Sequence, residues 1–369
     1  MAVLARQISS NADDDSVREK LVARDVICQK YIHLAINQFG EALCLGQKHI
    51  FQALPRLLTL WFEFTAIQPP DELSETDVKK LEAKQDEANE VMANYVRTIP
   101  AISYYSVLPQ LISRIGHSDK NTALVVIAIL KRVLSKFPSQ AMWHLAWLRH
   151  SIHPDRQKRG EEIFKTAQKS LLKNEDMKMH DLLDASKGLF KFLIDLAKYQ
   201  PKKADQNYFN VHQWKGNVEL KEFVPPVQAA LAVSRNVVRK AGSSETFPKC
   251  VPRMRAFSTQ VQMMSSKARP KKLTAFAIPE GFKSTEPQSR HSSNKSAKGD
   301  IGEMHFLVKR EARGDLRKDA RVQDLNNVIN RLLSTSTSGR HNGIRQHRRL
   351  QLRTFSVVCL SEDCGILEW

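Results

Sequence analysis

The chain has 369 residues, of which 42% are hydrophobic and 26% charged, a composition that excludes an intrinsically disordered protein and leaves room for more than one domain. Its formal net charge of +18 fits either a nucleic-acid binder or one piece of a larger assembly. Because Lys and Arg are spread along the whole chain, we favour the second interpretation. The charge therefore does not by itself predict a nucleic-acid site.

The cysteines and the hydropathy indicate the cellular compartment to expect for this protein. The five cysteines are scattered and no second close Cys or His pair completes a zinc signature, so we expect no metal site and a reducing compartment. The N-terminus is polar, and the longest apolar run, Ala123 to Leu130, is far below the ~20 residues that a membrane span needs. We therefore expect an intracellular chain without membrane association.

Residues 1–16 are expected to be disordered, and residues 17–200 read almost entirely as helix. Apolar residues recur there with helical spacing, and proline-marked turns separate the segments. Pro55 lies inside one pattern, so that helix either starts or kinks at Pro55. The predicted helices cover 25–39, 48–64, 74–98, 121–137, 138–148, 156–172 and 182–199. Helices of this length with short turns indicate antiparallel pairs stacked into a solenoid, here with degenerate repeats.

The helical pattern stops after residue 200, and residues 201–244 are predicted to be a linker. A second domain is expected over 245–369. Its expected strands cover 255–264, 273–278, 304–309, 352–360 and 365–369; the first two, and a Pro-Lys-Lys turn at 270–272, are implied only by the family resemblance given below. A helix pattern follows the third strand and includes Val322, Leu325 and Leu332. The polar stretch 279–300 is predicted to be a surface insertion, and 334–349 a flexible connection.

One lysine stands at the end of an apolar, strand-like run. Met304 to Lys309 is followed by a short charged turn and then by the helix pattern. A kinase small lobe needs this order, because a strand lysine holds the ATP phosphates and an acidic residue on the next helix holds the lysine. The spacing alone only suggests such a site, since lysines at strand ends are common.

Five short motifs strengthen this interpretation. Phe306 to Lys309 with Asp315 to Asp319 resembles the small lobe of the phosphatidylinositol-3-kinase-related protein kinases, in particular the ATR-type DNA-damage checkpoint kinases in a fungal-like form. The resemblance extends to the motifs Leu352–Leu360, Cys364–Trp369, Ala53–Phe62 and Lys136–Trp143. It implies a mostly α fold, in which the end of the α-helical solenoid that precedes the kinase is followed by a partial α+β kinase small lobe.

The resemblance also implies an ATP site and its residues. Lys309 would hold the phosphates, and Asp319 would pair with this lysine or approach the nucleotide. Glu368 and Trp369 would lie at the adenine-facing hinge, with backbone groups and the Trp ring on the base. Ser265 and Ser266 would contribute to phosphate binding, although the small-residue loop expected of the family is not clean here.

Other charged residues near the motif have plainer interpretations. Asp315 and Asp324 compete with Asp319 as the acidic partner, but solvated helix-end charges are the favoured role for both. Arg317, Lys318 and Arg321 are read as an ordinary exposed face rather than a phosphate patch.

The family implies ATP-dependent serine/threonine phosphorylation in DNA-damage checkpoint signalling and repair, with protein substrates, a regulatory partner subunit, indirect contact with DNA and a nuclear location. The sequence ends at the expected hinge, and no catalytic or magnesium-binding motif of the large lobe occurs in it. We therefore expect a fragment that binds ATP, relies on a missing large lobe for its Mg²⁺ ligands and does not catalyse alone. The alternative is a non-catalytic helical-repeat scaffold or a basic adaptor that binds protein or nucleic acid.

Overall fold

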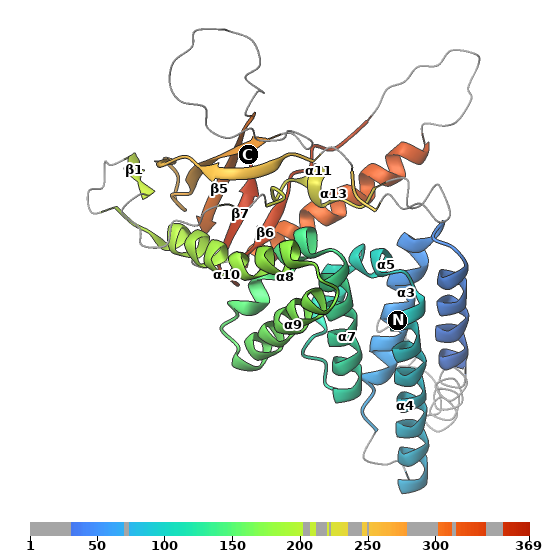
Figure 1. Ribbon diagram of the computed structural model, residues 1–369. Helices are drawn as coiled ribbons and strands as arrows, with labels where there is room; N and C mark the ends of the chain where they lie inside the picture. Colours follow the sequence, from blue (N-terminus) through green and yellow to red (C-terminus); the bar gives the residue numbers. More distant parts are fainter. Residues whose placement is uncertain are drawn as a thin grey trace, which may run out of the picture. The chain divides into compact units, whose positions relative to one another are not determined.

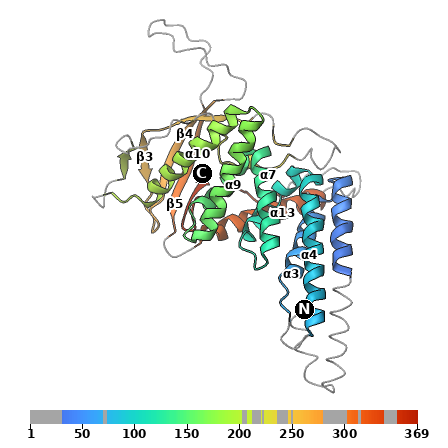
Figure 2. The same ribbon diagram turned by 60° about the horizontal axis from the view of Figure 1, so that its bottom comes forward.

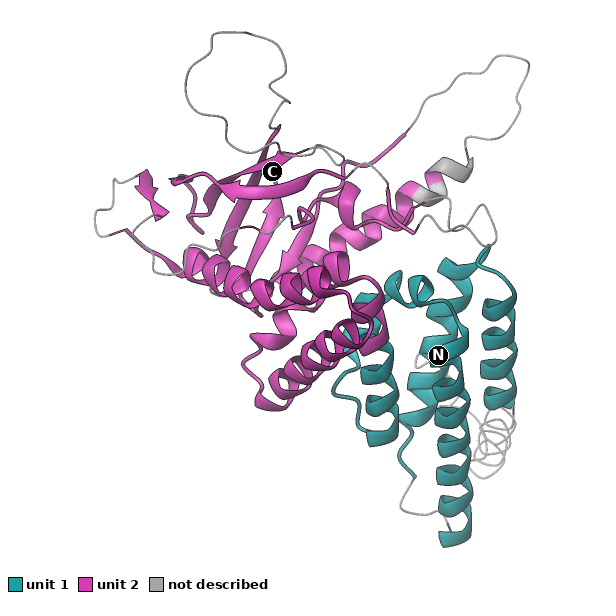
Figure 3. Ribbon diagram, viewed as in Figure 1, with its two compact units in different colours: residues 1–130, 238–241 teal, residues 131–237, 242–369 magenta. Residues whose placement is uncertain are grey.

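The computed structural model describes residues 31–69, 74–201, 207–211, 220, 223–234, 246–248, 251–278, 302–311, 315–336 and 350–369. The expected N-terminal tail, the insertion at 279–300 and most of the connection at 334–349 lie outside the described residues. The chain divides into two compact units, Met1–Leu130 with Val238–Ala241, and Lys131–Val237 with Gly242–Trp369, coloured separately in Figure 3. We describe each unit by itself.

The first unit is helical, as the periodicity predicts. Residues 31–45 form a helix, and the following helices are α3 (Ile50–Thr65), α4 (Glu75–Thr98), α5 (Ala101–Tyr105), α6 (Leu108–Ser113) and the start of α7 (Lys120–Lys136). α3 begins before Pro55, so the alternative in which Pro55 starts this helix is wrong. Ser74 caps α4, because its hydroxyl accepts a hydrogen bond from the Asp77 N–H at 3.3 Å.

A buried polar network joins three helices of this unit. The Oδ1 atom of Asn89 in α4 accepts hydrogen bonds from Trp61 Nε1 of α3 and Thr122 Oγ1 of α7, both at 2.9 Å. Its amide nitrogen donates to Asp119 Oδ2 at 3.1 Å. Because both the oxygen and the nitrogen of the Asn89 amide have a partner, the burial of this polar side chain is compensated by hydrogen bonds.

The second unit begins with the end of α7 and three helices, α8 (Pro138–Arg149), α9 (Pro154–Lys173) and α10 (Met177–Lys198). α10 starts earlier than the predicted Leu182, because the Asp176 carboxylate caps it by accepting from the Met179 N–H at 3.1 Å. α8 and α9 approach closely at Gly160, where a Cβ atom would lie 2.8 Å from the Leu148 carbonyl carbon. Among the helices described, none has the length and apolar character to cross a membrane.

Seven antiparallel strands follow within the described residues, together with a short helix, α11 (Gln228–Leu231), and the long helix α13 (Leu316–Ser336). The sheet order is β1-β3-β4-β5-β7-β6, and β2 also pairs with β4. The strands are β1 (Tyr208–Asn210), β2 (Arg253–Phe257), β3 (Gln260–Met263), β4 (Lys271–Ile278), β5 (Gly302–Arg310), β6 (Val357–Cys359) and β7 (Cys364–Glu368). β1 lies inside the segment that we predicted to be a linker, and it pairs with β3.

Three strand predictions need correction. The single strand expected over 255–264 is two strands that pair with β4 one after the other, because the pairing is interrupted at residues 258–259, where the Ser258 hydroxyl accepts the Gln260 N–H. Lys271 and Lys272 belong to β4 rather than to a turn. The strand expected over 352–360 pairs only at Val357–Cys359.

The two faces of the sheet differ in what covers them. Residues opposite one another in an antiparallel pair share a face, so the register places Lys271, Phe306, Val308 and Ile366 on one side. This side is buried beneath α10, which lies along the sheet in Figures 1 and 2. The ammonium of Lys271 donates to the Ala197 carbonyl at the end of α10, at 2.8 Å. The opposite side carries Lys309.

Candidate functional site

Lys309 lies near the end of β5, on the face of the sheet opposite α10. Its ammonium donates to Asp319 Oδ2 at 2.9 Å and lies 3.7 Å from Glu311 Oε2. The Lys309 side chain is 18% exposed, whereas that of Asp319 is 49% exposed. The structure therefore brings two of the expected site residues, ten positions apart in sequence, into an ion pair at the edge of solvent.

The first turn of α13 determines where Asp319 stands. Asp315 precedes the helix and caps it, accepting the Arg317 N–H at 3.0 Å and the Arg317 guanidinium in two bonds of 2.8 Å. The hydrogen bond from the Arg317 side chain is the main cause that lowers the pKa of the Asp315 carboxyl. Asp315 is thus a helix-end charge, as expected. Arg317 differs from the expected exposed residue, because it is half-buried and paired.

A glycine lets α13 rest on the sheet beside Lys309. Gly365 of β7 stands opposite Lys309, and a Cβ atom there would overlap the Leu316 side chain. Leu316 is 1% exposed and starts α13. Residues three apart on a helix share a face, so a contact at Leu316 orients Asp319 one turn later.

Glu368 and Trp369 continue β7 next to β5. Glu368 stands opposite Phe306, so its side chain lies on the face away from Lys309. There Glu368 Oε2 accepts the N–H groups of Gln228 and Ser356 at 2.8 and 2.9 Å. Only the backbone of Glu368 remains as a ligand group for the Lys309 face. The Trp369 N–H donates to the His305 carbonyl at 3.1 Å, and its side chain is 56% exposed.

Ser265 and Ser266 lie in the turn between β3 and β4. Backbone bonds within Met264–Pro270 close this turn, and Arg269 there has a φ of 43°, in the left-handed region. Because Lys271 pairs with Val308, the turn lies at the same end of the sheet as Lys309. Both serines are exposed, and the structure records no contact from either serine to the Lys309 side chain.

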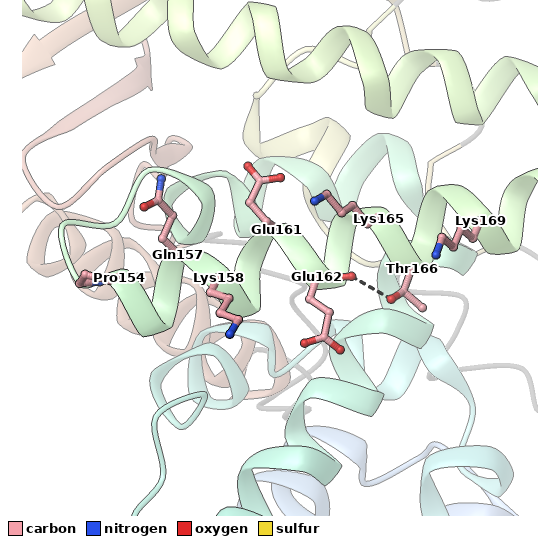
Figure 4. A pocket seen from close by; sticks show the side chains of 8 residues that line it. All are labelled: Pro154, Gln157, Lys158, Glu161, Glu162, Lys165, Thr166 and Lys169. Carbon is pink, nitrogen blue, oxygen red and sulfur yellow. Dashed lines mark hydrogen bonds between the residues drawn. The ribbon is translucent and has the colours of Figure 1, made fainter.

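A hollow on the surface lies elsewhere, along α9. Side chains of this helix line it, including Lys158, Glu162, Lys165 and Lys169 (Figure 4). Glu162 pairs with Lys131 at 2.6 Å, and lysines and carboxylates alternate around the rim. This mixed, open surface has the character of a solvated helix face, so we assign no ligand to it.

The residues around Lys309 fit the phosphate end of a nucleotide. A half-buried ammonium, held by a carboxylate, provides a fixed positive charge next to an open face of the sheet. In the part of the chain that the structure describes, no group of three His, Cys, Asp or Glu residues is arranged to hold a metal ion. Sequence reasoning did not single out two further residues near the first turn of α13. Trp147 stacks with Arg317, and Glu362 pairs with Arg156. The only signal for either in the sequence is that Trp147 belongs to a helix rich in large apolar residues.

Comparison with known proteins gives consistent results. Residues 87–187 match the family model for the HEAT repeats of serine/threonine-protein kinase ATR-like proteins. The chain is 30% identical over 92% of its length to serine/threonine-protein kinase ATR of Arabidopsis thaliana, and 27% identical over 92% to serine/threonine-protein kinase MEC1 of Candida albicans. Protein kinase rad3 of Schizosaccharomyces pombe is 26% identical over 90% of the chain. The chain spans 12–13% of the length of these relatives.

Solved structures support the fold. The FAT and kinase domain of CtTel1 matches 95% of the chain with a TM-score of 0.64 and 19% identity, and the chain covers 21% of that structure. The open conformation of CtTel1 matches the same share with a TM-score of 0.65. The predicted fold class, a helical repeat region followed by a partial antiparallel sheet, is confirmed. Together these matches bear out the resemblance of the chain to the ATR-type sequences of the phosphatidylinositol-3-kinase-related protein kinases.

Proposed function

We propose that this chain forms the nucleotide-holding part of an ATP-dependent serine/threonine protein kinase of the DNA-damage checkpoint. The ion pair between Lys309 and Asp319 at 2.9 Å is the observation that carries the proposal. Phosphoryl transfer depends largely on positioning and on electrostatic stabilisation of the phosphate oxygens. A lysine held by a carboxylate on the neighbouring helix supplies both.

The remaining expected residues are assigned by their places around this pair. Trp369 continues β7 on the Lys309 side of the sheet and offers its exposed ring to the adenine, while Glu368 contributes backbone groups only. The turn with Ser265 and Ser266 lies at the phosphate end. The small lobe of this assignment covers 245–369, after a helical scaffold over 17–200 and a linker over 201–244. ATP is the nucleotide of this assignment, and Mg²⁺ would accompany its phosphates.

The activity of the whole kinase needs more than these residues. No Asp-Phe-Gly motif occurs in this sequence, and its two His-x-Asp triplets, His117–Asp119 and His153–Asp155, lie in the helical part of the chain, so we assign phosphoryl transfer to no residue of it. We place the protein in the nucleus, with protein substrates, a regulatory partner subunit and indirect contact with DNA, because the relatives are named ATR, MEC1 and rad3 kinases.

Nucleotide binding by the full chain tests the proposal. Displacement of a fluorescent ATP analogue by ATP should give an affinity that Lys309→Ala weakens by about tenfold to a hundredfold, because a charge-assisted bond contributes about 1.5–3 kcal/mol. Arg310→Ala is the matched control, since Arg310 is the next residue and pairs with Asp363 at 2.7 Å. Equal affinities for Lys309→Ala and the wild type would refute the assignment.

Binding measurements with ATP and with duplex DNA on the same chain distinguish the kinase function from the adaptor function. If the chain binds no ATP but binds duplex DNA with a steep dependence on salt, its net charge of +18 acts on nucleic acid and the adaptor interpretation holds.

A further inference from the structure

Two arginine side chains, from helices far apart in the sequence, lie over the ring of Trp147 in the last turns of α8. The Cζ atom of Arg156, from α9, lies 5.3 Å from the centroid of the Trp147 ring, and that of Arg317, from α13, lies 5.0 Å away. Trp147 is only 7% exposed, whereas the two arginine side chains keep 29% and 31% of their surface. Guanidinium groups stack on indole rings in this distance range, with the favourable electrostatics of a cation over a π face.

Carboxylates fix both arginines from their other sides. Asp315 holds Arg317 with two bonds of 2.8 Å, and Glu362 lies 3.5 Å from Arg156. Glu362 belongs to the turn between β6 and β7 and also accepts from Ser151 Oγ at 2.6 Å. The Trp147 ring thus stands at a junction of α8, the start of α9, the first turn of α13 and the β6–β7 turn.

This junction bears directly on the ion pair at Lys309. Arg317 lies two residues before Asp319 in the same helical turn, and a helix moves as a rigid segment over such a distance. Besides the contact of Leu316 with Gly365, the stacking of Arg317 on Trp147 is a second contact that holds this turn. A shift of Arg317 would therefore carry Asp319 with it.

We propose that Trp147 is a positioning residue, which sets the place of Asp319 against Lys309 through Arg317 and so couples the α8–α9 helices to the nucleotide site. This inference rests on the proposed function for its consequence, although the positioning itself does not require a nucleotide. The coupling runs within one compact unit, from Trp147 to Arg317 by stacking, from Arg317 to Asp319 along the backbone of α13, and from Asp319 to Lys309 by the ion pair.

Substitutions of two aromatic residues in the full chain separate this role from general packing. Trp147→Leu removes the ring that Arg317 contacts. Phe164→Leu is the matched control, because Phe164 of α9 is also buried and has an arginine, Arg149 of α8, 4.4 Å from its ring centroid, so that its cation–π pair does not involve α13. Trp147→Phe retains an aromatic face, and Arg317→Lys retains the charge at a half-exposed position without the planar stacking group.

Two readouts do not depend on nucleotide: amide hydrogen exchange in residues 320–324 of α13, and the rate at which acetic anhydride acetylates Lys309. We expect Trp147→Leu to accelerate both by about threefold to tenfold, because a cation–π contact accounts for such a factor. Arg317→Lys should act in the same direction, Trp147→Phe should restore most of the protection, and Phe164→Leu should change neither readout. ATP affinity should fall by the same factor in Trp147→Leu.

The outcomes distinguish this inference from the proposed function. If the wild type binds no ATP but exchange and acetylation respond as expected, Trp147 positions α13 and the nucleotide assignment fails. If the wild type binds ATP while Trp147→Leu and Arg317→Lys match Phe164→Leu in all readouts, the positioning inference is overturned and the proposed function stands.

Discussion

Replacing Gly365 by alanine perturbs the contact that seats α13 on the sheet. The added methyl would lie 2.6 Å from the carbonyl oxygen of Val358 and would overlap the Leu316 side chain. Val358 contributes a backbone atom of the neighbouring strand β6, so it cannot rotate away. Overpacking of this kind costs about 1–3 kcal/mol, against about 0.5–1 kcal/mol gained when alanine replaces a strand glycine. We expect a net loss of about 1–2 kcal/mol in the free energy of unfolding.

Urea denaturation followed by far-UV circular dichroism measures this loss. With a slope of about 1–3 kcal/mol per molar urea, the midpoint should fall by roughly 0.3–2 M. Gly302→Ala is the matched control, because Gly302 starts β5 and has no atom within 4 Å of its added Cβ; its midpoint should stay or rise. Equal midpoints for the two variants would show that Leu316 and Val358 do not confine this position.

Two further predictions concern the buried side of the sheet. Burial lowers the pKa of Lys271 from 10.5 to about 8, so the folded chain releases this proton at lower pH than the unfolded chain, and wild-type stability should rise between about pH 8 and 10.5. In urea titrations, the difference in unfolding free energy between Lys271→Met and the wild type should therefore shrink across that window by up to about 3 kcal/mol. Lys272→Met, which removes a lysine from the other face, is the control. A difference that stays constant with pH would contradict the burial argument. Glu368→Ala leaves the N–H groups of Gln228 and Ser356 without their acceptor, so it should lower the free energy of unfolding by about 1–3 kcal/mol; a loss of ATP affinity without a loss of stability would instead place the carboxylate on the nucleotide side.

Local signals in the sequence determined most of the helices. Ser74 and Pro138 start their helices where the pattern places them, because caps and N-terminal prolines act through neighbouring backbone groups. The apolar run ending at Lys309 gave the strand, and the charged turn after it gave the helix. The start of α10 was missed, although Asp176 caps this helix through the Met179 N–H.

The strands and the site residues were harder to predict, since pairing partners decide them. The resemblance to the family implied a turn at Lys271, yet this residue pairs with β3 and β5, and its ammonium donates to α10. Glu368 resembles a hinge residue, but the register with Phe306 turns its carboxylate away from Lys309. A shift of one residue in pairing reverses such a face, and no local pattern specifies the register.

The sequence by itself determined that the first part of the chain is helical. It also determined that a strand ending in a lysine is followed by a helix with an acidic residue in its first turn, and which family this order resembles. Only the tertiary structure decided which carboxylate meets Lys309, because Asp315 precedes α13, Asp319 and Asp324 lie on it, and the way its first turn is held selects among them. Leu316 on Gly365 and Arg317 on Trp147 hold that turn. These contacts join residues up to 170 positions apart (147 to 317), a separation over which periodicity and spacing carry no information.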